Sequence, residues 1–482
     1  MISLGGIIGV IWTLNIIAAL FTVFREKRDI AATWAWLLVL SFLPLIGFIL
    51  YAFFGRQLSH RQLAKFTTTP DATLTRVLTL QRQLHPAYSP TDTHTQAAVK
   101  HMLGMFLNTA NAPVTVHNSV QLFTSGRALF DDIIAKADQA QHSIYIEFYT
   151  FAADALGKEM RDVLIARAKA GVAVYVLYDA WGSMGTRPEF FADLRAAGGH
   201  AEPFLGIHSN LVDFRLNFRN HRKIVTIDGT TSYIGGFNIG DQYVDQSAKF
   251  GHWRDTHLRI VGEASLSLQH RFVTDWNTTV PETPLSADLT PLAHATTIGS
   301  ETAIQLVASG PNTTLEQIKL GYLQLINLAR QKLYIQTPYL IPDQSVLDAL
   351  RSAIRAGVDV RIMVPHMPDH AFVYRATQYY AHLLAEEGAK IYFYQDGFIH
   401  AKTITVDDVL ASVGSANLDF RSLQLNFEAN AFIYNVDLAK QLAAIFEADI
   451  ADSTLVTAAD FRQMSLWLRF KQAFSRLLSP IL

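Results

Sequence analysis

The chain has 482 residues, of which 50% are hydrophobic and only 17% are charged, which is apolar for a soluble protein of this size. Its net charge of −2 at pH 7 gives no support for a polyanion-binding surface, so the composition disfavours nucleic acid as a substrate. The sequence contains no cysteine, which excludes disulfides, thiolate metal sites and a cysteine nucleophile. A chain of this length suits two domains with extensions.

Residues 1–57 are predicted to form a transmembrane hairpin. Residues 2–24 are almost all apolar and, at about 1.5 Å per residue, a helix of this length reaches roughly 35 Å, enough to cross a bilayer. Residues 30–54 form a second apolar stretch, and the charged residues 25–29 separate the two. No basic region precedes the first stretch, so we reject a cleaved signal peptide. The alternative is two buried helices of a soluble domain.

A hairpin would place the N-terminus and the rest of the chain on the same side of the membrane. The loop between the two stretches has three basic residues and the segment after the hairpin has three, so the charge rule does not choose between the two sides of the membrane. Residues 58–115 follow, and their apolar side chains recur at helical spacing. We interpret this stretch as a helical connector, and it is equally consistent with the first helices of the lobe that follows.

The rest of the chain reads as two similar lobes, residues 116–280 and 301–455, joined by a linker at 281–300 that is rich in Pro, Thr and Ala. Strand-like segments, helical segments and Ala-Gly-Val turns recur in the same order and at a nearly constant offset in both lobes. Because strands alternate with helices, each lobe is predicted to be α/β, a sheet flanked by helices.

One short pattern occurs once in each lobe. A Lys follows a His by two positions, an Asp follows the same His by seven, and an Asn comes later, after a Gly-Gly or Gly-Ser pair. The first copy contains His221, Lys223, Asp228 and Asn238, and the second contains His400, Lys402, Asp407 and Asn417. Residues 224–227 and 403–406 are all β-branched and are predicted to be strands, so each His lies on the same face as its Lys. Two such copies facing each other would surround one anionic group.

These side chains suit displacement at the phosphorus of a phosphodiester. Lys ammonium and Asn amide groups can hold the developing negative charge without a metal. A neutral imidazole can attack phosphorus, while a protonated imidazole on the opposite side gives its proton to the departing oxygen. The pattern therefore predicts a phosphohistidine intermediate that an alcohol or water then opens, with no metal and no cofactor.

The doubled pattern resembles that of the phospholipase D superfamily, and four neighbouring phrases narrow the resemblance to bacterial cardiolipin synthases. These phrases are Trp-Arg-Asp-Thr-His at 253–257, Asp-Trp-Asn at 275–277, Gln-Thr-Pro-Tyr at 336–339 and Asn-Phe-Glu at 426–428. The resemblance runs from the N-terminal hairpin to Leu482. It implies two phospholipase D-like lobes that form one catalytic unit.

The resemblance also implies an activity. A phosphatidyl group would pass from one phosphatidylglycerol to another, giving cardiolipin and glycerol, with His221 as nucleophile and His400 as acid and then base. The symmetry of the sequence permits the reverse assignment. The Lys and Asn residues of the two copies would bind phosphate. The resemblance further implies a multi-pass protein of the bacterial inner membrane whose catalytic domain lies on the cytoplasmic side. It leaves a homo-oligomer open.

Two carboxylates outside the pattern are candidates to orient the imidazoles. An imidazole that works as nucleophile or acid usually needs a partner on its other nitrogen. Aligning the lobes places Asp255 beside Glu428, and we expect each to orient one imidazole, either on its own lobe or on the opposite lobe. The alternative is a surface salt bridge. Asp228 and Asp407 belong to the catalytic pattern, but a strand-ending Asp before a turn most often makes turn hydrogen bonds, and we favour that role.

Residues 456–482 are predicted to be a C-terminal amphipathic helix. Apolar residues recur at helical spacing between 466 and 478, with basic residues elsewhere around the helix. This pattern is typical of a helix lying in a membrane interface, and a helix that caps the second lobe is equally consistent.

Several other functions use the same pattern. A phospholipase D-type hydrolase would use water as acceptor, and a transphosphatidylase could take phosphatidylethanolamine as donor. A nuclease conflicts with the hairpin and the near-zero net charge. A membrane scaffold that merely binds anionic lipid would not need its histidines.

Overall fold

The computed structural model describes residues 4–24, 30–43, 46–51, 55, 72–84, 93–204, 218–287, 289, 292, 302–313 and 315–479. The chain forms two compact units. One comprises residues 1–64 with 207–218, and the other comprises residues 65–206 with 219–482. The second unit contains both lobes.

The first unit contains the helices α1 (Leu4–Phe24), α2 (Ile30–Phe42) and α3 (Ile46–Leu50). A small apolar cluster joins α1 to α2, with Val23 against Leu40 and Tyr51. Asn15 also donates from its side chain to the Leu40 carbonyl at 2.8 Å. Within the described ranges, no helix meets the length and apolarity required to cross a bilayer. The charged stretch 25–29 lies outside the described residues.

Lobe one is built on a seven-stranded sheet with the order β2-β9-β7-β6-β3-β4-β5. The strands are β2 (Asn118–Phe123), β3 (Ser143–Phe148), β4 (Ala173–Asp179), β5 (His200–Phe204), β6 (Lys223–Ile227), β7 (Thr231–Gly235) and β9 (His257–Gly262). Strands β3, β4 and β5 are parallel, and the other pairs are antiparallel. The helices are α7 (Gly126–Asp138), α8 (Ala155–Lys169), α9 (Ala192–Ala196) and α10 (Ala264–Thr279).

Lobe two repeats this plan in a nine-stranded sheet with the order β1-β10-β19-β17-β16-β11-β13-β14-β20. Its strands are β1 (Val114–Thr115), β10 (Ala303–Ser309), β11 (Lys332–Gln336), β13 (Asp359–Pro365), β14 (Lys390–Tyr394), β16 (Thr403–Val406), β17 (Leu410–Gly414), β19 (Glu428–Tyr434) and β20 (Ser453–Val456). Its helices include α11 (Gln317–Leu328), α12 (Gln344–Arg355), α13 (Ala371–Glu387) and α14 (Val436–Asp449). The predicted pair of α/β lobes is confirmed.

The inner faces of the two sheets share one core. Ile224, Ile234 and Leu258 of lobe one pack in the same cluster as Val413 and Ile433 of lobe two, and α10 and α14 cover that cluster. Because apolar side chains of both sheets lose their solvent contact here, the hydrophobic effect holds the lobes together. The lobes therefore meet as two halves of one body, which brings the two motif copies to a shared boundary.

Part of the predicted helical connector belongs to lobe two. Its helices are α5 (Ala72–Leu84) and α6 (Thr93–Thr109). Met102 and Phe106 of α6 lie in the main core of lobe two, and β1, which follows α6, pairs with β10. Gly321 of α11 makes room for this packing, because a Cβ there would come within 2.6 Å of the Phe106 ring. Neither interpretation of the connector anticipated this placement. Most of the predicted linker at 281–300 lies outside the described residues.

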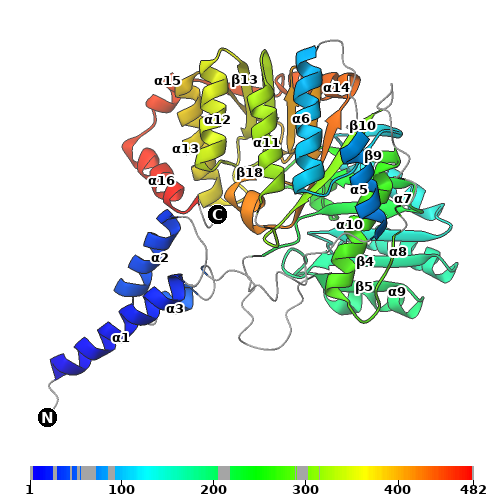
Figure 1. Ribbon diagram of the computed structural model, residues 1–482, viewed down its shortest axis with the longest axis horizontal. Helices are drawn as coiled ribbons and strands as arrows, with labels where there is room; N and C mark the ends of the chain where they lie inside the picture. The colour runs from blue at the N-terminus through cyan, green and yellow to red at the C-terminus, as the bar shows by residue number, and fades with distance from the viewer. Residues whose placement is uncertain are drawn as a thin grey trace. The chain divides into compact units, whose positions relative to one another are not determined.

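The chain ends on lobe two. After β20 come α15 (Ala458–Arg462) and α16 (Leu466–Leu477), and Figure 1 shows α16 beside α13 at the outer edge of the lobe.

Candidate active site

Each histidine of the doubled pattern is held by backbone pairing with the opposite lobe. The N–H of His221, just before β6, donates to the Phe427 carbonyl at 2.9 Å. The N–H of His400, just before β16, donates to the Arg254 carbonyl at 2.7 Å. Around His400 the pairing is a short parallel ladder between β8 (Trp253–Arg254) and β15 (Phe398–Ile399). The two imidazoles are therefore fixed at the boundary between the lobes.

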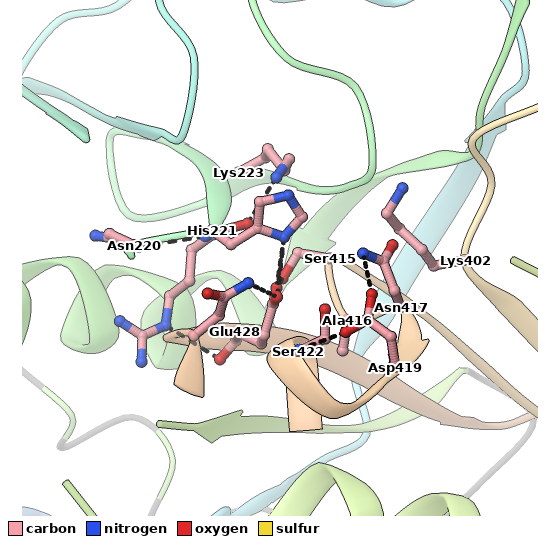
Figure 2. Close-up of polar contacts among 12 residues, drawn as sticks. Asn220, His221, Lys223, Lys402, Ser415, Ala416, Asn417, Asp419, Ser422 and Glu428 are labelled. Atoms are coloured by element: carbon pink, nitrogen blue, oxygen red, sulfur yellow. Dashed lines mark hydrogen bonds and ion pairs between the residues drawn. The ribbon is translucent and has the colours of Figure 1, made fainter. Parts of the chain in front are cut away.

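Each imidazole also contacts a carboxylate that comes from the other lobe. His221 Nδ1 lies 2.9 and 3.0 Å from the two oxygens of Glu428, as Figure 2 shows. His400 Nδ1 lies 2.7 Å from Oδ2 of Asp255. Both carboxylates are fully buried. Burial alone would raise the pKa of Asp255, but Lys402 and His400 lower it below its usual value. The carboxylate pair that the lobe alignment predicted thus lies against the two imidazoles, crossed between lobes.

Both lysines of the pattern are buried beside their histidines. Lys223 donates to the His221 carbonyl at 2.7 Å, and Lys402 Nζ lies 2.8 Å from His400 Nδ1. Burial, which disfavours the charged ammonium, lowers the pKa of Lys223 to about 7 and that of Lys402 to about 8. An anion bound between these lysines would raise both values.

The pKa values of the two imidazoles are also lowered. Burial lowers the pKa of His221, and it lowers the pKa of His400 to about 4. In each case the lysine of the opposite lobe adds to the lowering, Lys402 acting on His221 and Lys223 on His400. The two halves of the site are therefore in one electrostatic environment, in which the neutral form of both rings is favoured.

The two asparagines of the pattern face the site differently. The amide oxygen of Asn238 accepts a hydrogen bond from the Thr150 N–H at 3.2 Å. The amide nitrogen of Asn417 instead donates to Asp419 at 3.1 Å (Figure 2). Burial raises the pKa of Asp419 to about 6. Both amides are thus held by neighbouring groups of the protein, Asn417 by Asp419 and Asn238 by the Thr150 backbone and the Tyr243 side chain.

Asp228 and Asp407 lie at the far ends of their strands from the histidines. Asp228 accepts hydrogen bonds from three consecutive backbone N–H groups at residues 141–143, and Asp407 does the same at residues 330–332. Both have positive φ, 53° and 50°, which a short polar side chain tolerates in a turn. The structure does not bring these two carboxylates into the cluster of imidazoles; they support the loops ahead of β3 and β11.

Two buried arginines also lie at the boundary between the lobes, and the doubled pattern did not predict them. Arg222 donates to the Glu428 carbonyl at 3.1 Å and to Asp275 at 2.5 Å. Arg254 donates to the Asp255 carbonyl at 2.5 Å and pairs with Asp449 at 2.8 Å. A signal existed, because Arg222 lies between the His and Lys of the first copy, where the second copy has Ala401.

Two tyrosines were also missed. The Tyr149 ring lies 5.0 Å from the His221 ring, and the Tyr339 ring lies 6.5 Å from the His400 ring. They follow β3 and β11, the corresponding strands of the two lobes, so a comparison of the repeats could have found them. Within the described part of the chain, no group of three or more His, Asp or Glu side chains could hold a metal ion.

Comparisons with known proteins place this arrangement in a family. The model of the cardiolipin synthase, PLD-like domain matches residues 133–260 and 322–450, one match in each lobe. The major cardiolipin synthase ClsA of Bacillus subtilis is 45% identical over 483 residues, which cover 99% of both chains. The chain belongs to the cardiolipin synthase family. The predicted family is thus confirmed, and with it a phosphatidyltransferase activity.

Further comparisons agree with this assignment. A cardiolipin synthase of Staphylococcus aureus is 43% identical over 472 residues, covering 97% of this chain and 95% of that one. A phospholipase D-nuclease N-terminal model matches residues 13–56. Among solved structures, a phosphatidylserine synthase of Haemophilus influenzae aligns with a TM-score of 0.60 at 16% identity, covering 79% of this chain and 100% of that one. At that identity the likeness shows the shared fold alone.

Proposed function

We propose that this cardiolipin synthase transfers a phosphatidyl group from one phosphatidylglycerol to a second through a phosphohistidine on His221, giving cardiolipin and glycerol. The observation that carries the proposal is the crossed pairing of His221 with Glu428 and of His400 with Asp255. With Nδ1 of each ring held by a carboxylate, Nε2 is the nitrogen that would attack phosphorus or carry the proton.

In the first step, neutral His221 attacks the phosphorus of a bound phosphatidylglycerol. The bond from Nε2 to phosphorus forms, the bond from phosphorus to the glycerol oxygen breaks, and His400 gives its proton to that oxygen. Burial lowers the pKa of His221 and so favours the neutral ring, which is the attacking form. The pKa of His400 is lowered as well, so the proton that His400 gives is expected to enter the site when the anionic diester binds. Glycerol leaves, and the phosphatidyl group stays on His221.

In the second step, a hydroxyl of another phosphatidylglycerol replaces His221 on phosphorus. His400, now neutral, takes the proton of that hydroxyl, the new oxygen to phosphorus bond forms, and the bond to Nε2 breaks. Cardiolipin leaves with both imidazoles restored to their starting protonation. Neither step consumes an oxidant, a reductant or an added cofactor.

The lysines supply the charge that the transition state needs. Lys223 and Lys402 are fully buried, where an ammonium stabilises phosphoryl oxygens more than it would in water. An anionic diester would raise the lowered pKa of both side chains and so keep them protonated during the reaction. Asn238, whose amide is held by the Thr150 backbone and by the Tyr243 side chain, is a further donor for the phosphate in this proposal.

We infer that residues 2–24 and 30–54 anchor the enzyme in the bacterial inner membrane, with the lobes on the cytoplasmic side. The apolar composition of both stretches and their length support the anchor. The cytoplasmic side is proposed from the family resemblance alone, because the basic residues do not choose between the two sides.

Product analysis with labelled phosphatidylglycerol tests the function. The wild-type chain is expected to give cardiolipin and one glycerol per cardiolipin, whereas His221→Ala and His400→Ala should each lose at least about a thousandfold in rate. Phosphatidic acid as the main product would identify a hydrolase, and a requirement for phosphatidylethanolamine would identify another donor. Trapping the phosphatidyl group on His400 would reverse the roles of the two histidines.

A further inference from the structure

Helix α16 exposes an aromatic face on the outside of lobe two. Trp467, Phe470 and Phe474 retain 63%, 58% and 47% of their surface, and Leu466 and Leu477 retain 81% and 75%. The rings stack along the helix, with centroids 5.5 Å apart between Trp467 and Phe470 and 6.3 Å apart between Phe470 and Phe474. Contiguous exposed apolar side chains of this kind mark an interaction site. We call these five residues the α16 face.

The opposite side of α16 is polar and packs on α13. Gln472 and Ser475 are buried there, and Gln472 lies 3.5 Å from Gln378 of α13. Arg476 donates to the hydroxyl of Tyr379 at 3.1 Å. A helix on the surface of a soluble protein usually turns its apolar stripe inward. Here the arrangement is reversed, so the α16 face is not what attaches the helix to the lobe.

The charge of α16 indicates what covers this face. The helix carries Arg469, Lys471 and Arg476 and no acidic residue. Lys471 lies over the Trp467 ring at 5.2 Å, which keeps its ammonium beside the aromatic face. Aromatic rings flanked by basic side chains fit the boundary between acyl chains and anionic headgroups.

Helix α13 connects this face to the catalytic site. Its amino-terminal half contacts the segment after β11, where the Thr377 hydroxyl accepts from the Leu340 N–H at 3.2 Å. Just ahead of α13, Asp369 accepts a hydrogen bond from Tyr339, whose ring faces His400. A surface that holds α16 would therefore also set the position of α13 and of the His400 side of the site.

We propose that the α16 face docks on the anionic phospholipid surface that supplies the substrate and holds lobe two against its headgroups. The proposal rests on the proposed function, because it assumes a lipid substrate. It adds a second attachment to the membrane, independent of residues 1–57. The docked helix lies in the interface plane, with the aromatic rings below the headgroups and the basic side chains among them.

The absence of cysteine from the chain makes a direct test simple. Phe470→Cys, labelled with a nitroxide in the full-length protein, is reconstituted in vesicles of phosphatidylglycerol and phosphatidylcholine. We expect the label to collide more with oxygen than with a nickel chelate. The matched control is Ala170→Cys, an exposed residue in the turn ahead of β4, which should show the opposite preference. Cardiolipin formation in the same sample reports separately on the proposed function.

Two outcomes would overturn the docking proposal. One is a label at position 470 that stays accessible to the nickel chelate while the sample makes cardiolipin. The other is dipolar broadening between labels on two copies, which would show that a second chain covers the face. If the sample makes no cardiolipin, the proposed function fails, whatever the label reports.

A rate measurement gives an independent check. Phe470→Glu combined with Phe474→Glu should lower the rate on vesicles by about tenfold, because two charges enter the apolar layer. The rate on a monomeric short-chain phosphatidylglycerol should change by less than about twofold, since that substrate needs no docking. Leu455→Glu, an exposed apolar residue of β20, is the matched control and should affect neither rate. Equal losses on both substrates would contradict docking.

Discussion

The two carboxylates of the site reach their imidazoles in different ways. Glu428 is held by the hydroxyl of Ser415, which donates to it at 2.5 Å. Asp255 lies over Gly236, the residue that corresponds to Ser415, and a Cβ on Gly236 would come within 2.0 Å of its carboxylate. The shorter acid is thus paired with the residue that has no side chain. Different contacts therefore position the two carboxylates, although both carboxylates fix Nδ1 of an imidazole.

Replacing either carboxylate by its isosteric amide should reduce turnover more than binding. In Glu428→Gln and Asp255→Asn the shape is kept, but the imidazole loses the charge that stabilises its protonated form and fixes its tautomer. We expect kcat to fall by about a hundredfold to ten-thousandfold, with a much smaller change in KM. Steady-state kinetics on short-chain phosphatidylglycerol measure this split, with Glu447→Gln, an exposed glutamate of α14, as control. Unchanged kcat would remove the carboxylate from the site.

Binding of the diester should take up protons. The pKa of His400 is lowered to about 4, that of Lys223 to about 7 and that of Lys402 to about 8. An anion between these groups favours their charged forms, so each pKa rises on binding and, at pH 7, roughly one proton is expected to enter the site. The diester itself does not titrate at this pH, so the uptake reports on the protein.

Titration calorimetry in buffers of different ionisation enthalpy measures this uptake. The His221→Ala variant lacks the proposed nucleophile, so we expect it to bind short-chain phosphatidylglycerol with little turnover, and it keeps the other three groups. Adding Lys223→Met should reduce the number of protons taken up, because Lys223, with a pKa of about 7, is only half protonated at pH 7 before the diester binds. Net proton release on binding would show that the site does not hold the diester between these side chains.

At the scale of elements, the boundary between the lobes determines the site. The segment before β6 and the segment before β16 each pair with the carboxylate-bearing segment of the other lobe. Each crossing contains one arginine, Arg222 in the first and Arg254 in the second. Their partners, Asp275 and Asp449, lie on α10 and α14, the helices that cover the core shared by the two sheets. The positions of the imidazoles therefore depend on buried ion pairs between each crossing and a neighbouring helix.

Arg254→Met should weaken both folding and catalysis. It leaves the largely buried Asp449 without its cation, which typically costs about 3 kcal/mol, and it removes the donor to the Asp255 carbonyl. The double variant Arg254→Met, Asp449→Leu should recover most of the stability, because no buried charge remains, but not the rate. Denaturant unfolding and kcat give the two readouts. If the rate returned together with the stability, Arg254 would have no positioning role.

The sequence predicted the repeated elements well because each copy confirms the other. The strands after both histidines, the corners that carry Asn238 and Asn417, and the pairing of Asp255 with Glu428 in the alignment all came from the repeat. The repeat could not show that each imidazole contacts the carboxylate of the other lobe. Arg222 and Arg254 occupy positions that differ between the copies, so internal comparison gave them no counterpart.

At the scale of the whole molecule, chain order and packing order differ. Helix α6 and strand β1 precede lobe one in the sequence, yet both lie in lobe two. Amphipathic spacing predicted α6 as a helix, but spacing carries no information on which distant core receives an apolar face. Phe106 packs against Phe432 with ring centroids 4.6 Å apart, although more than three hundred residues separate them in the sequence. Helix α6 and strand β1 therefore pack against the second half of the chain.

This placement predicts where the chain can be shortened. A chain that begins at residue 72 keeps α5, α6 and β1, so we expect it to unfold cooperatively and to make cardiolipin from short-chain phosphatidylglycerol. A chain that begins at residue 111 lacks α6. It therefore loses the contacts that the apolar side chains between Val99 and Phe106 make in the core of lobe two. At about 1.5–3 kcal/mol for each large apolar side chain, that loss approaches the whole stability of a typical domain. Amide hydrogen exchange should then show α11 and β10 unprotected. Native protection there, without α6, would contradict its role in that core.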